Sequence, residues 1–307
     1  MTVARLAVLG PTASGKSAVA MALATSDRGR ALGIELVSID AMQVYRGMDI
    51  GTAKPTMAER ADVRHHLIDL VDADQTFTVA QFQSSYRAAV DDIDARGGIA
   101  VLVGGTGLYL RAVVDDLDIP GQWPEIRSDL EKEAETHGPE RLHERLSALD
   151  PVAATKMEPT NTRRIVRALE VTIGSGRAFS SYGPGVDAYP PSLVRQVALS
   201  WDRAVLGRRI ESRVHAMVEA GLVDEVRRLL DARPSATAMQ ALGYKEIAEH
   251  LEGRSSLDEA VETTILRTRQ FAVRQERWFR RDPRIEWFAV HEDPAAEVAQ
   301  GLLATLA

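Results

Sequence analysis

The chain has 307 residues, of which 45% are hydrophobic and 26% charged, and its formal net charge is -7. This composition is typical of a globular protein with one large or two smaller domains, and the acidic charge argues mildly against nucleic acid as a partner. With no cysteine, disulfides, thiolate metal sites and cysteine catalysis are excluded, and no apolar run approaches the ~20 residues of a membrane span. We therefore expect a soluble, cytoplasmic protein that does not associate with membranes.

The first part of the chain alternates short aliphatic strands with helices. Strands are predicted at 6–9, 35–39 and 99–103, and a helical pattern covers 79–95. Strands separated by helices are typical of a doubly wound α/β sheet with parallel strands. Ligands bind such sheets beyond the carboxyl ends of the strands, so the segments that follow the predicted strands are the candidates for a site.

The segment after the first predicted strand fits the pattern G-x-x-x-x-G-K-[ST] of a phosphate-binding loop. Glycines let the backbone wrap an anion, and the following helix adds the partial positive charge of its N-terminus. Lys16 would place its ammonium on the outer phosphate, and the Ser17 hydroxyl would be a ligand of Mg²⁺. A glycine turn without a ligand is the alternative, which the strand–loop–helix context disfavours. The predicted phosphate-binding residues are Gly10, Pro11, Thr12, Ala13, Ser14, Gly15, Lys16 and Ser17.

The middle of the chain is helical in pattern. Prolines and glycines mark both ends of residues 121–192, and no convincing strand lies between them. Pro124 and Pro139 stand at first-turn positions of two predicted helices, and a third helix is predicted from about Asn161 to Ile173. We expect residues 121–192 to be a helical domain inserted into a core, and this core comprises residues 1–120 and 193–307.

The last part of the chain is mostly helical, with strands predicted at 193–201 and 285–290 and a long helix at 257–281. Seven arginines lie between Arg267 and Arg284, opposed by only two acidic residues. Three of them recur every seven residues and so share one face of the predicted helix. Because the positive charge is unevenly distributed, a polyanionic partner remains compatible with the acidic net charge. The three arginines on one face are Arg267, Arg274 and Arg281.

Asp40 follows directly on the second predicted strand. A carboxylate at that edge of a sheet, facing a phosphate loop, can hold Mg²⁺ through water or act as a general base. A helix cap or a turn aspartate is the other interpretation. The density of polar residues and glycines over 40–55 favours a functional loop, because a simple connection rarely needs so many of them.

Several ordered motifs resemble the tRNA dimethylallyltransferase family, and the resemblance covers nearly the whole chain. The first four are G-P-T-A-S-G-K-S at 10–17, S-x-D-x-x-Q-x-Y-x-G-M-D-I-G-T-A-K-P at 38–55, H-H-L-I-D-L at 65–70 and V-G-G-T-G-L-Y at 103–109. The match continues at 150–151, 163–170, 241–246 and 268–275. One departure is visible, because the family usually has serine after the aspartate and this chain has Ala41.

The resemblance implies a P-loop NTPase-like parallel sheet flanked by helices, with a helical insertion domain and a helical C-terminal part. It also implies transfer of a dimethylallyl group from dimethylallyl diphosphate to the N6 amine of the adenosine next to the anticodon in tRNA. The implied partners are the anticodon stem-loop of tRNA and dimethylallyl diphosphate, and the implied cofactor is Mg²⁺. We expect no obligate protein partner and a monomeric enzyme.

The resemblance further implies the roles of individual residues. Asp40 would accept a proton from the attacking amine, and Thr106 would hydrogen-bond near that amine or the diphosphate. Lys16 and Arg213 would contact the diphosphate. Taken without the resemblance, Thr106 is a turn residue and Arg213 a solvated helix residue. Gln43 would pair with the target adenine, which has to leave its stack to reach the site.

The implied contacts with tRNA lie in the loop after the second strand and in the predicted insertion, whose helix 163–170 also carries arginines for the phosphates of the anticodon stem. The residues expected to contact tRNA are Asp40, Ala41, Met42, Gln43, Thr106, Arg127, Arg163, Arg164, Ile165, Val166 and Arg167.

Three alternatives remain from the sequence. A small-molecule kinase with the same loop for ATP explains residues 1–120, but not the helical insertion, Gln43 or the arginine-bearing helices. A nucleotide-dependent switch is disfavoured, because Gly104 and Gly105 stand where an acidic residue would end the third strand. A relative that prenylates free AMP or ADP would have little need for the arginines of the second half.

Overall fold

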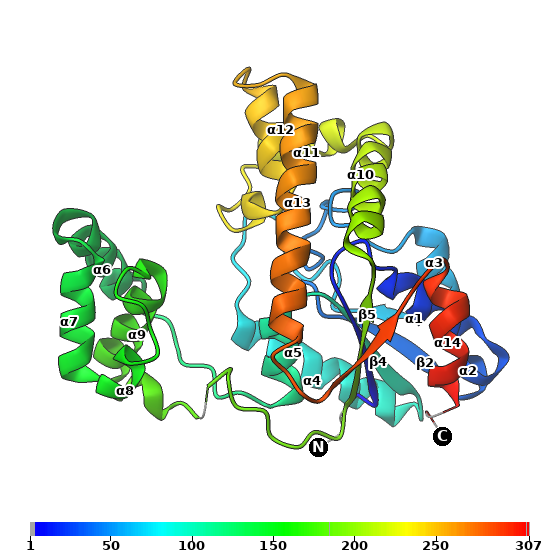
Figure 1. Cartoon of the computed structure of the whole chain (residues 1–307), viewed down its shortest axis with the longest axis horizontal. Coiled ribbons are helices and arrows are strands. Elements are labelled where there is room, and N and C mark those ends of the chain that lie inside the picture. Colours follow the sequence, from blue (N-terminus) through cyan, green and yellow to red (C-terminus); the bar gives the residue numbers. More distant parts are fainter. Residues whose placement is uncertain (1–3, 184, 305, 307) are drawn as a thin grey trace. The chain divides into compact units, whose positions relative to one another are not determined.

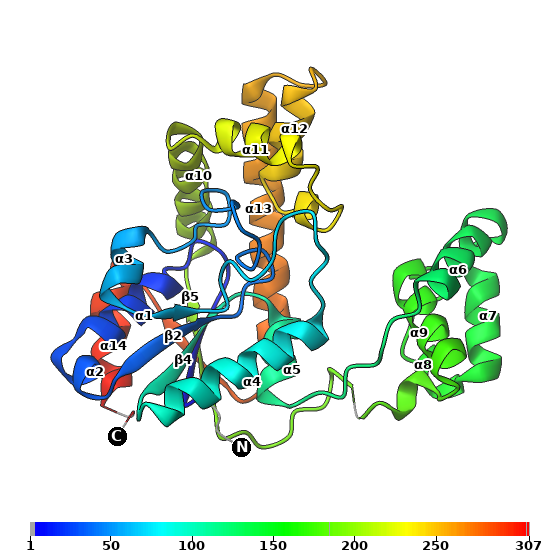
Figure 2. The same cartoon turned by 180° about the vertical axis from the view of Figure 1, so that it is seen from behind.

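The computed structural model describes residues 4–183, 185–304 and 306. The chain divides into two compact units, one made of Met1–Asp115 with Tyr189–Ala307 and the other of Asp116–Ala188. The larger unit contains the sheet and the smaller one is helical (Figures 1 and 2). Within the described ranges, no helix is both long enough and apolar enough to cross a membrane.

A parallel six-stranded sheet organises the larger unit, in the order β3–β2–β4–β1–β5–β6. Strand β1 lies between β4 and β5, with Leu9 opposite both Gly104 and Ala198. The predicted doubly wound α/β fold is therefore confirmed. The strands are β1 (Leu6–Leu9), β2 (Ile34–Ser38), β3 (His65–His66), β4 (Ile99–Gly104), β5 (Arg195–Ser200) and β6 (Ile285–Ala289).

The strands are aliphatic because helices cover both faces of the sheet. One face packs Leu9 and Leu102 against α4 (Val79–Ala95), α5 (Gly107–Val114) and the end of α13 (Leu257–Phe279). The opposite face packs Leu6, Val8 and Val101 against α1 (Lys16–Thr25) and α14 (Pro294–Leu303). The first and last helices of the chain therefore lie side by side, as both views show (Figures 1 and 2).

Helices α10 to α13 form a group of their own beside the sheet (Figure 1). Helices α11 and α12 pack against Val44, Tyr45 and Met48 of the loop that follows β2. Helix α13 runs from this group back to the sheet, where Phe279 joins the core. The helices not yet given are α2 (Asp27–Ala31), α3 (Met57–Asp62), α10 (Arg203–Glu219), α11 (Leu222–Asp231) and α12 (Tyr244–Leu251), with a 3₁₀ turn η2 (Ala238–Gln240).

The smaller unit packs its helices around an aliphatic core that includes Leu142, Leu146 and Leu169. Pro124 and Pro139 begin helices, as predicted, because a proline at the first turn loses no hydrogen bond. The elements are α6 (Pro124–His137), α7 (Pro139–Leu149), α8 (Pro151–Ala154), α9 (Thr162–Ser175) and a 3₁₀ turn η1 (Phe179–Ser181).

Glu170 is the buried charge that ties this unit together. Its carboxylate accepts hydrogen bonds from Trp123 N at 2.8 Å and from Arg127 Nη2 at 2.6 Å, and Arg167 Nη1 lies 3.0 Å away. Burial alone would raise the pKa of Glu170, but these donors outweigh it and hold the pKa below its usual value. The carboxylate is therefore ionised, and it joins the start of α6 to α9.

Replacing this carboxylate tests its structural role. We expect Glu170→Ala to lower the free energy of unfolding of the smaller unit by about 3 kcal/mol, because two arginines and an N–H lose their partner. Hydrogen exchange of the α6 and α9 amides in the whole protein would measure the change. Glu131→Ala on exposed α6 surface is the matched control, expected to stay within about 0.5 kcal/mol. Equal protection in both variants would contradict the assignment.

Candidate active site

Three loops meet at the carboxyl edge of the sheet, because β2, β4 and β1 are neighbours. Thr106, which follows β4, joins two of them. Its N–H donates to Ile39 O at 3.3 Å, and its Oγ1 accepts from Ala41 N at 3.2 Å. The latter contact involves only the backbone of Ala41, so the alanine at this position leaves it intact.

The loop between β1 and α1 has the backbone geometry of an anion-binding turn. Gly10 (φ 145°) and Gly15 (φ 92°) adopt conformations that favour glycine. Both are also tightly packed: a Cβ on Gly10 would lie 2.8 Å from Ser14 Oγ, and one on Gly15 would overlap Pro294 of α14. The predicted strand, loop and helix therefore follow one another as a phosphate loop requires.

Cationic side chains from α1 and α10 hold this loop. Lys16 Nζ donates to Pro11 O at 2.8 Å, Arg209 Nε donates to Ala13 O at 3.0 Å, and Arg213 donates to Thr12 Oγ1. Two buried polar atoms at the loop, Ser14 Oγ and Arg213 Nε, have no hydrogen-bond partner within the described structure. Unsatisfied buried polar atoms beside converging cations are what an anion-binding site requires.

The charges at the loop act on one another. Burial, followed by repulsion from Arg213, lowers the pKa of Lys16 to about 8, and Asp40 opposes the change. Burial likewise lowers the pKa of Arg213, again against the attraction of Asp40. Positive charge exceeds negative charge here, so a bound polyanion would relieve the repulsion.

Asp40 directly follows Ile39 at the end of β2, and its carboxylate is partly exposed. Its Oδ1 accepts a hydrogen bond from Met42 N at 2.8 Å, which fixes the orientation of the group. Asp40 therefore combines a fixed orientation with access from outside, as a general base needs. The contact between Ala41 and Thr106 links the loop of Asp40 to the loop of Thr106, and the charge of Asp40 acts to raise the pKa of Lys16 and of Arg213.

The donors at the loop are compatible with Mg²⁺. Ser17 is exposed in the first turn of α1, and Asp40 provides a carboxylate at the same edge of the sheet. Across the described ranges, no group of three or more histidine and acidic side chains is arranged to hold a metal. Mg²⁺ needs no such cage, because it keeps several waters and binds through one or two protein oxygens and substrate phosphates.

Gln43 is engaged inside its own loop. Its Oε1 accepts from Ser38 Oγ at 2.7 Å, and its Nε2 donates to Thr52 O at 3.1 Å and Ala53 O at 3.3 Å. Pairing with adenine would require Gln43 to exchange these bonds. Recognition of the base by Gln43 stays a prediction, and the structure gives Gln43 a role in bracing the loop.

Glu225 of α11 holds the same loop, and no sequence motif predicts it. Its carboxylate is buried and accepts from the N–H groups of Asp49, Ile50 and Gly51 at 2.9–3.1 Å, and from Tyr244 Oη at 2.6 Å. A Cβ on Gly51 would overlap the Tyr244 ring. Gly51 and Tyr244 lie in the family motifs. Glu225 lies in an ordinary amphipathic helix, whose sequence pattern does not indicate a contact with this loop.

The predicted tRNA contacts of the smaller unit separate into two kinds. Arg163 and Arg164 are exposed on α9, whereas Arg127 and Arg167 are held by Glu170. At two further predicted positions the side chains are buried in the helical core, so a contact with tRNA there would involve the backbone. These residues are Ile165 and Val166.

One of the three arginines predicted to share a face of the long C-terminal helix is paired within the structure. Arg267 pairs with the buried Glu246, and Arg269 pairs with Glu211 at 2.7 Å. Arg274 lies over the Phe271 ring, 5.7 Å from its centroid, and remains exposed. Arg267 therefore contributes to the packing of α12 on α13, and the contact of this face with RNA stays a prediction.

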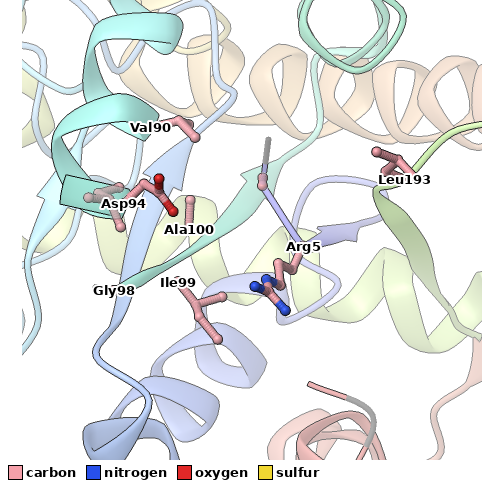
Figure 3. A pocket seen from close by; sticks show the side chains of 9 residues that line it. Arg5, Val90, Asp94, Gly98, Ile99, Ala100 and Leu193 are labelled. Atoms are coloured by element: carbon pink, nitrogen blue, oxygen red, sulfur yellow. The ribbon is translucent and has the colours of Figure 1, made fainter. Parts of the chain in front are cut away.

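A cavity of about 330 Å³ lies at the other edge of the sheet, where the strands begin (Figure 3). None of the predicted site residues lines it, so the chemistry at the carboxyl edge does not use it. The cavity is lined by Ala4, Arg5, Val90, Ile93, Asp94, Gly98, Ile99, Ala100 and Leu193.

A parallel sheet with a cation-lined phosphate loop after β1 and a carboxylate after β2 defines a P-loop enzyme that acts on a phosphorylated substrate. A family model described as IPP transferase matches residues 43–282. The chain belongs to this family, whose curated members are named tRNA dimethylallyltransferase.

Individual relatives match over nearly their whole length. The chain is 51% identical to the tRNA dimethylallyltransferase of Kineococcus radiotolerans, over 92% of this chain and 89% of that protein. It is 48% identical to that of Pseudarthrobacter chlorophenolicus, over 97% of each. The crystal structure of the full-length tRNA isopentenylpyrophosphate transferase from Bacillus halodurans superposes with a TM-score of 0.70 at 37% identity, covering 99% of this chain and 96% of that one. The resemblance inferred from the motifs is therefore confirmed, and the kinase alternative is not favoured.

The lowered pKa of Lys16 predicts how anion binding depends on pH. Above pH 8 the free protein carries a neutral Lys16 and must take up a proton when an anion binds. We therefore expect the Kd for pyrophosphate to rise up to about tenfold per pH unit above pH 8. Titration calorimetry between pH 7 and 9.5 would measure this. Lys16→Met is the control, because pyrophosphate itself ionises in the same way in both titrations. If the Kd of the two proteins changes in parallel with pH, the prediction is contradicted.

Proposed function

We propose that this protein transfers the dimethylallyl group of dimethylallyl diphosphate to the N6 amine of the adenosine adjacent to the anticodon in tRNA, releasing diphosphate. The observation that carries the proposal is the convergence of Asp40 and Thr106 with the cationic loop of Lys16 and Arg213 at one edge of the sheet. Membership of the tRNA dimethylallyltransferase family supports the choice of both substrates.

The phosphate loop serves the leaving group. The bond between the primary allylic carbon and the diphosphate oxygen breaks, and negative charge builds on the departing diphosphate. Lys16, Arg213 and the loop N–H groups stabilise that charge, and Ser14 Oγ and Arg213 Nε gain the partners they lack. The Ser17 hydroxyl, and Asp40 through water, would hold Mg²⁺, which would supply further neutralisation of that charge.

The loops after β2 and β4 serve the acceptor. The exocyclic amine of adenine is a weak nucleophile, so its placement and the removal of its proton both matter. Asp40 accepts that proton as the new nitrogen–carbon bond forms. Thr106 accepts a hydrogen bond from the N–H of Ala41, the residue after Asp40, and its hydroxyl can donate to the diphosphate or orient the amine.

The smaller unit serves the RNA. Arg163 and Arg164 are exposed on α9 and suit phosphates of the anticodon stem, because phosphate contacts orient a nucleic acid without reading its sequence. The target base leaves its stack to enter the site near residues 40–43. A cytoplasmic location and a monomeric state remain predictions of the sequence.

The decisive test incubates the protein with Mg²⁺, labelled dimethylallyl diphosphate and unmodified tRNA with adenosine next to the anticodon. We expect label in the RNA, and we expect Asp40→Asn to lower kcat about 10²- to 10⁴-fold with little change in the Kd for tRNA. Asp74→Asn, an exposed aspartate beyond the same loop, is the control that keeps full activity. If RNA stays unlabelled while ATP is consumed with a small alcohol, the protein is a kinase.

A second test addresses the tRNA surface. We expect the double variant Arg163→Gln/Arg164→Gln to raise the Kd for tRNA and to reduce the slope of log K against log salt by about 2, one for each phosphate contact. The KM for dimethylallyl diphosphate stays unchanged. Arg141→Gln, exposed on α7 of the same unit, is the matched control. A salt slope equal to that of the wild type would exclude these arginines from the interface.

A further inference from the structure

Gln275 joins the two loops that carry the leaving-group and acceptor chemistry. Its Oε1 accepts a hydrogen bond from Thr12 N at 2.8 Å, and its Nε2 donates to Gly105 O at 2.9 Å. The side chain is 7% exposed and comes from α13, 263 residues after Thr12. One buried amide thus spans the phosphate loop and the loop after β4.

The chemistry of this contact suits a primary amide. An amide presents an acceptor and a donor side by side, whereas a carboxylate offers only acceptors and a thioether only a weak acceptor. A carboxylate at residue 275 would leave Gly105 O without a donor. The side chain is also fixed sterically, because a Cβ on Gly105 would overlap Gln275 Nε2.

The next turn of α13 repeats the arrangement. A Cβ on Gly107, the first residue of α5, would overlap the indole of Trp278. The close approach of α13 therefore accounts for two glycines of the V-G-G-T-G-L-Y motif.

The hydrogen bonds continue from Gln275 to the acceptor side. Gly105 is followed by Thr106, whose Oγ1 accepts from Ala41 N next to Asp40. Displacement at the allylic carbon requires the diphosphate and the attacking amine to be held in line, within ~0.5 Å of the productive geometry. In the proposed reaction, the distance between the loops of Thr12 and Thr106 determines how the diphosphate and the amine are aligned. Gln275 bonds to both loops and so constrains that distance.

We propose that Gln275 is a positioning residue that holds the diphosphate loop and the Gly105–Thr106 loop at the distance required for transfer. The proposal rests on the proposed transferase function. It adds a residue that acts through its hydrogen bonds to the backbone of both loops.

The test compares Gln275→Met and Gln275→Glu with Gln270→Met, an exposed glutamine on the same helix. We expect both Gln275 variants to lower kcat about 10- to 100-fold, with the Kd for tRNA and the KM for dimethylallyl diphosphate within about threefold for Gln275→Met. Gln275→Glu also raises the Kd for pyrophosphate about tenfold, because a carboxylate then faces the phosphate loop. Gln270→Met behaves as the wild type.

A purely structural role would lower the thermal midpoint of the Gln275 variants without separating kcat from KM. Wild-type kcat in both Gln275 variants would overturn the proposal. Gln275→Asn keeps the amide but shortens its reach by one methylene, so it replaces the other variants if they fail to fold. We expect a low kcat for it as well, and a wild-type kcat would overturn the proposal. If the wild type prenylates no tRNA, the proposed function fails, and the pyrophosphate titration still decides: an unchanged Kd in Gln275→Glu overturns the role of Gln275.

Discussion

The whole site depends on the close approach of three backbone loops at the carboxyl edge of the sheet. Strand β4 separates β2 from β1, so the loops after these strands meet only if the segment between them is narrow. Gly104 meets this need, because a Cβ there would lie 2.6 Å from Ile39 O. Gly105 and Gly107 then leave room for α13. The absence of side chains at these glycines lets the loops for the acceptor and the leaving group come together.

Charge is then distributed so that an acidic protein can hold polyanions. Carboxylates inside the structure are neutralised locally: Glu170 by two arginines and an N–H, and Glu225 by backbone N–H groups and a tyrosine hydroxyl. They therefore compete little with Lys16 and Arg213 for a bound anion. The net charge of -7 describes the surface as a whole and says little about the field at the phosphate loop.

The elements that could be predicted from the sequence are those determined by residues close together in the chain. The aliphatic strands and the helix over 79–95 appear within three residues of their predicted ends, because burial and capping are encoded in neighbouring residues. The two-residue strand at His65–His66 has no such pattern and was not predicted. The phosphate loop is one continuous motif, whereas Gln275 and Glu225 reach the site from distant helices with ordinary amphipathic patterns. The tRNA prediction over 163–167 included buried positions because a helical motif contains both its exposed and its inward face.

The contacts between the two ends of the chain bear on how the enzyme is made. Gly15 lies against Pro294, Thr12 is held by Gln275, and α1 packs along α14. The phosphate loop is synthesised well before its supports, because Gln275 follows Thr12 by 263 residues. A nascent chain therefore carries the loop without these supports until α13 and α14 have been synthesised.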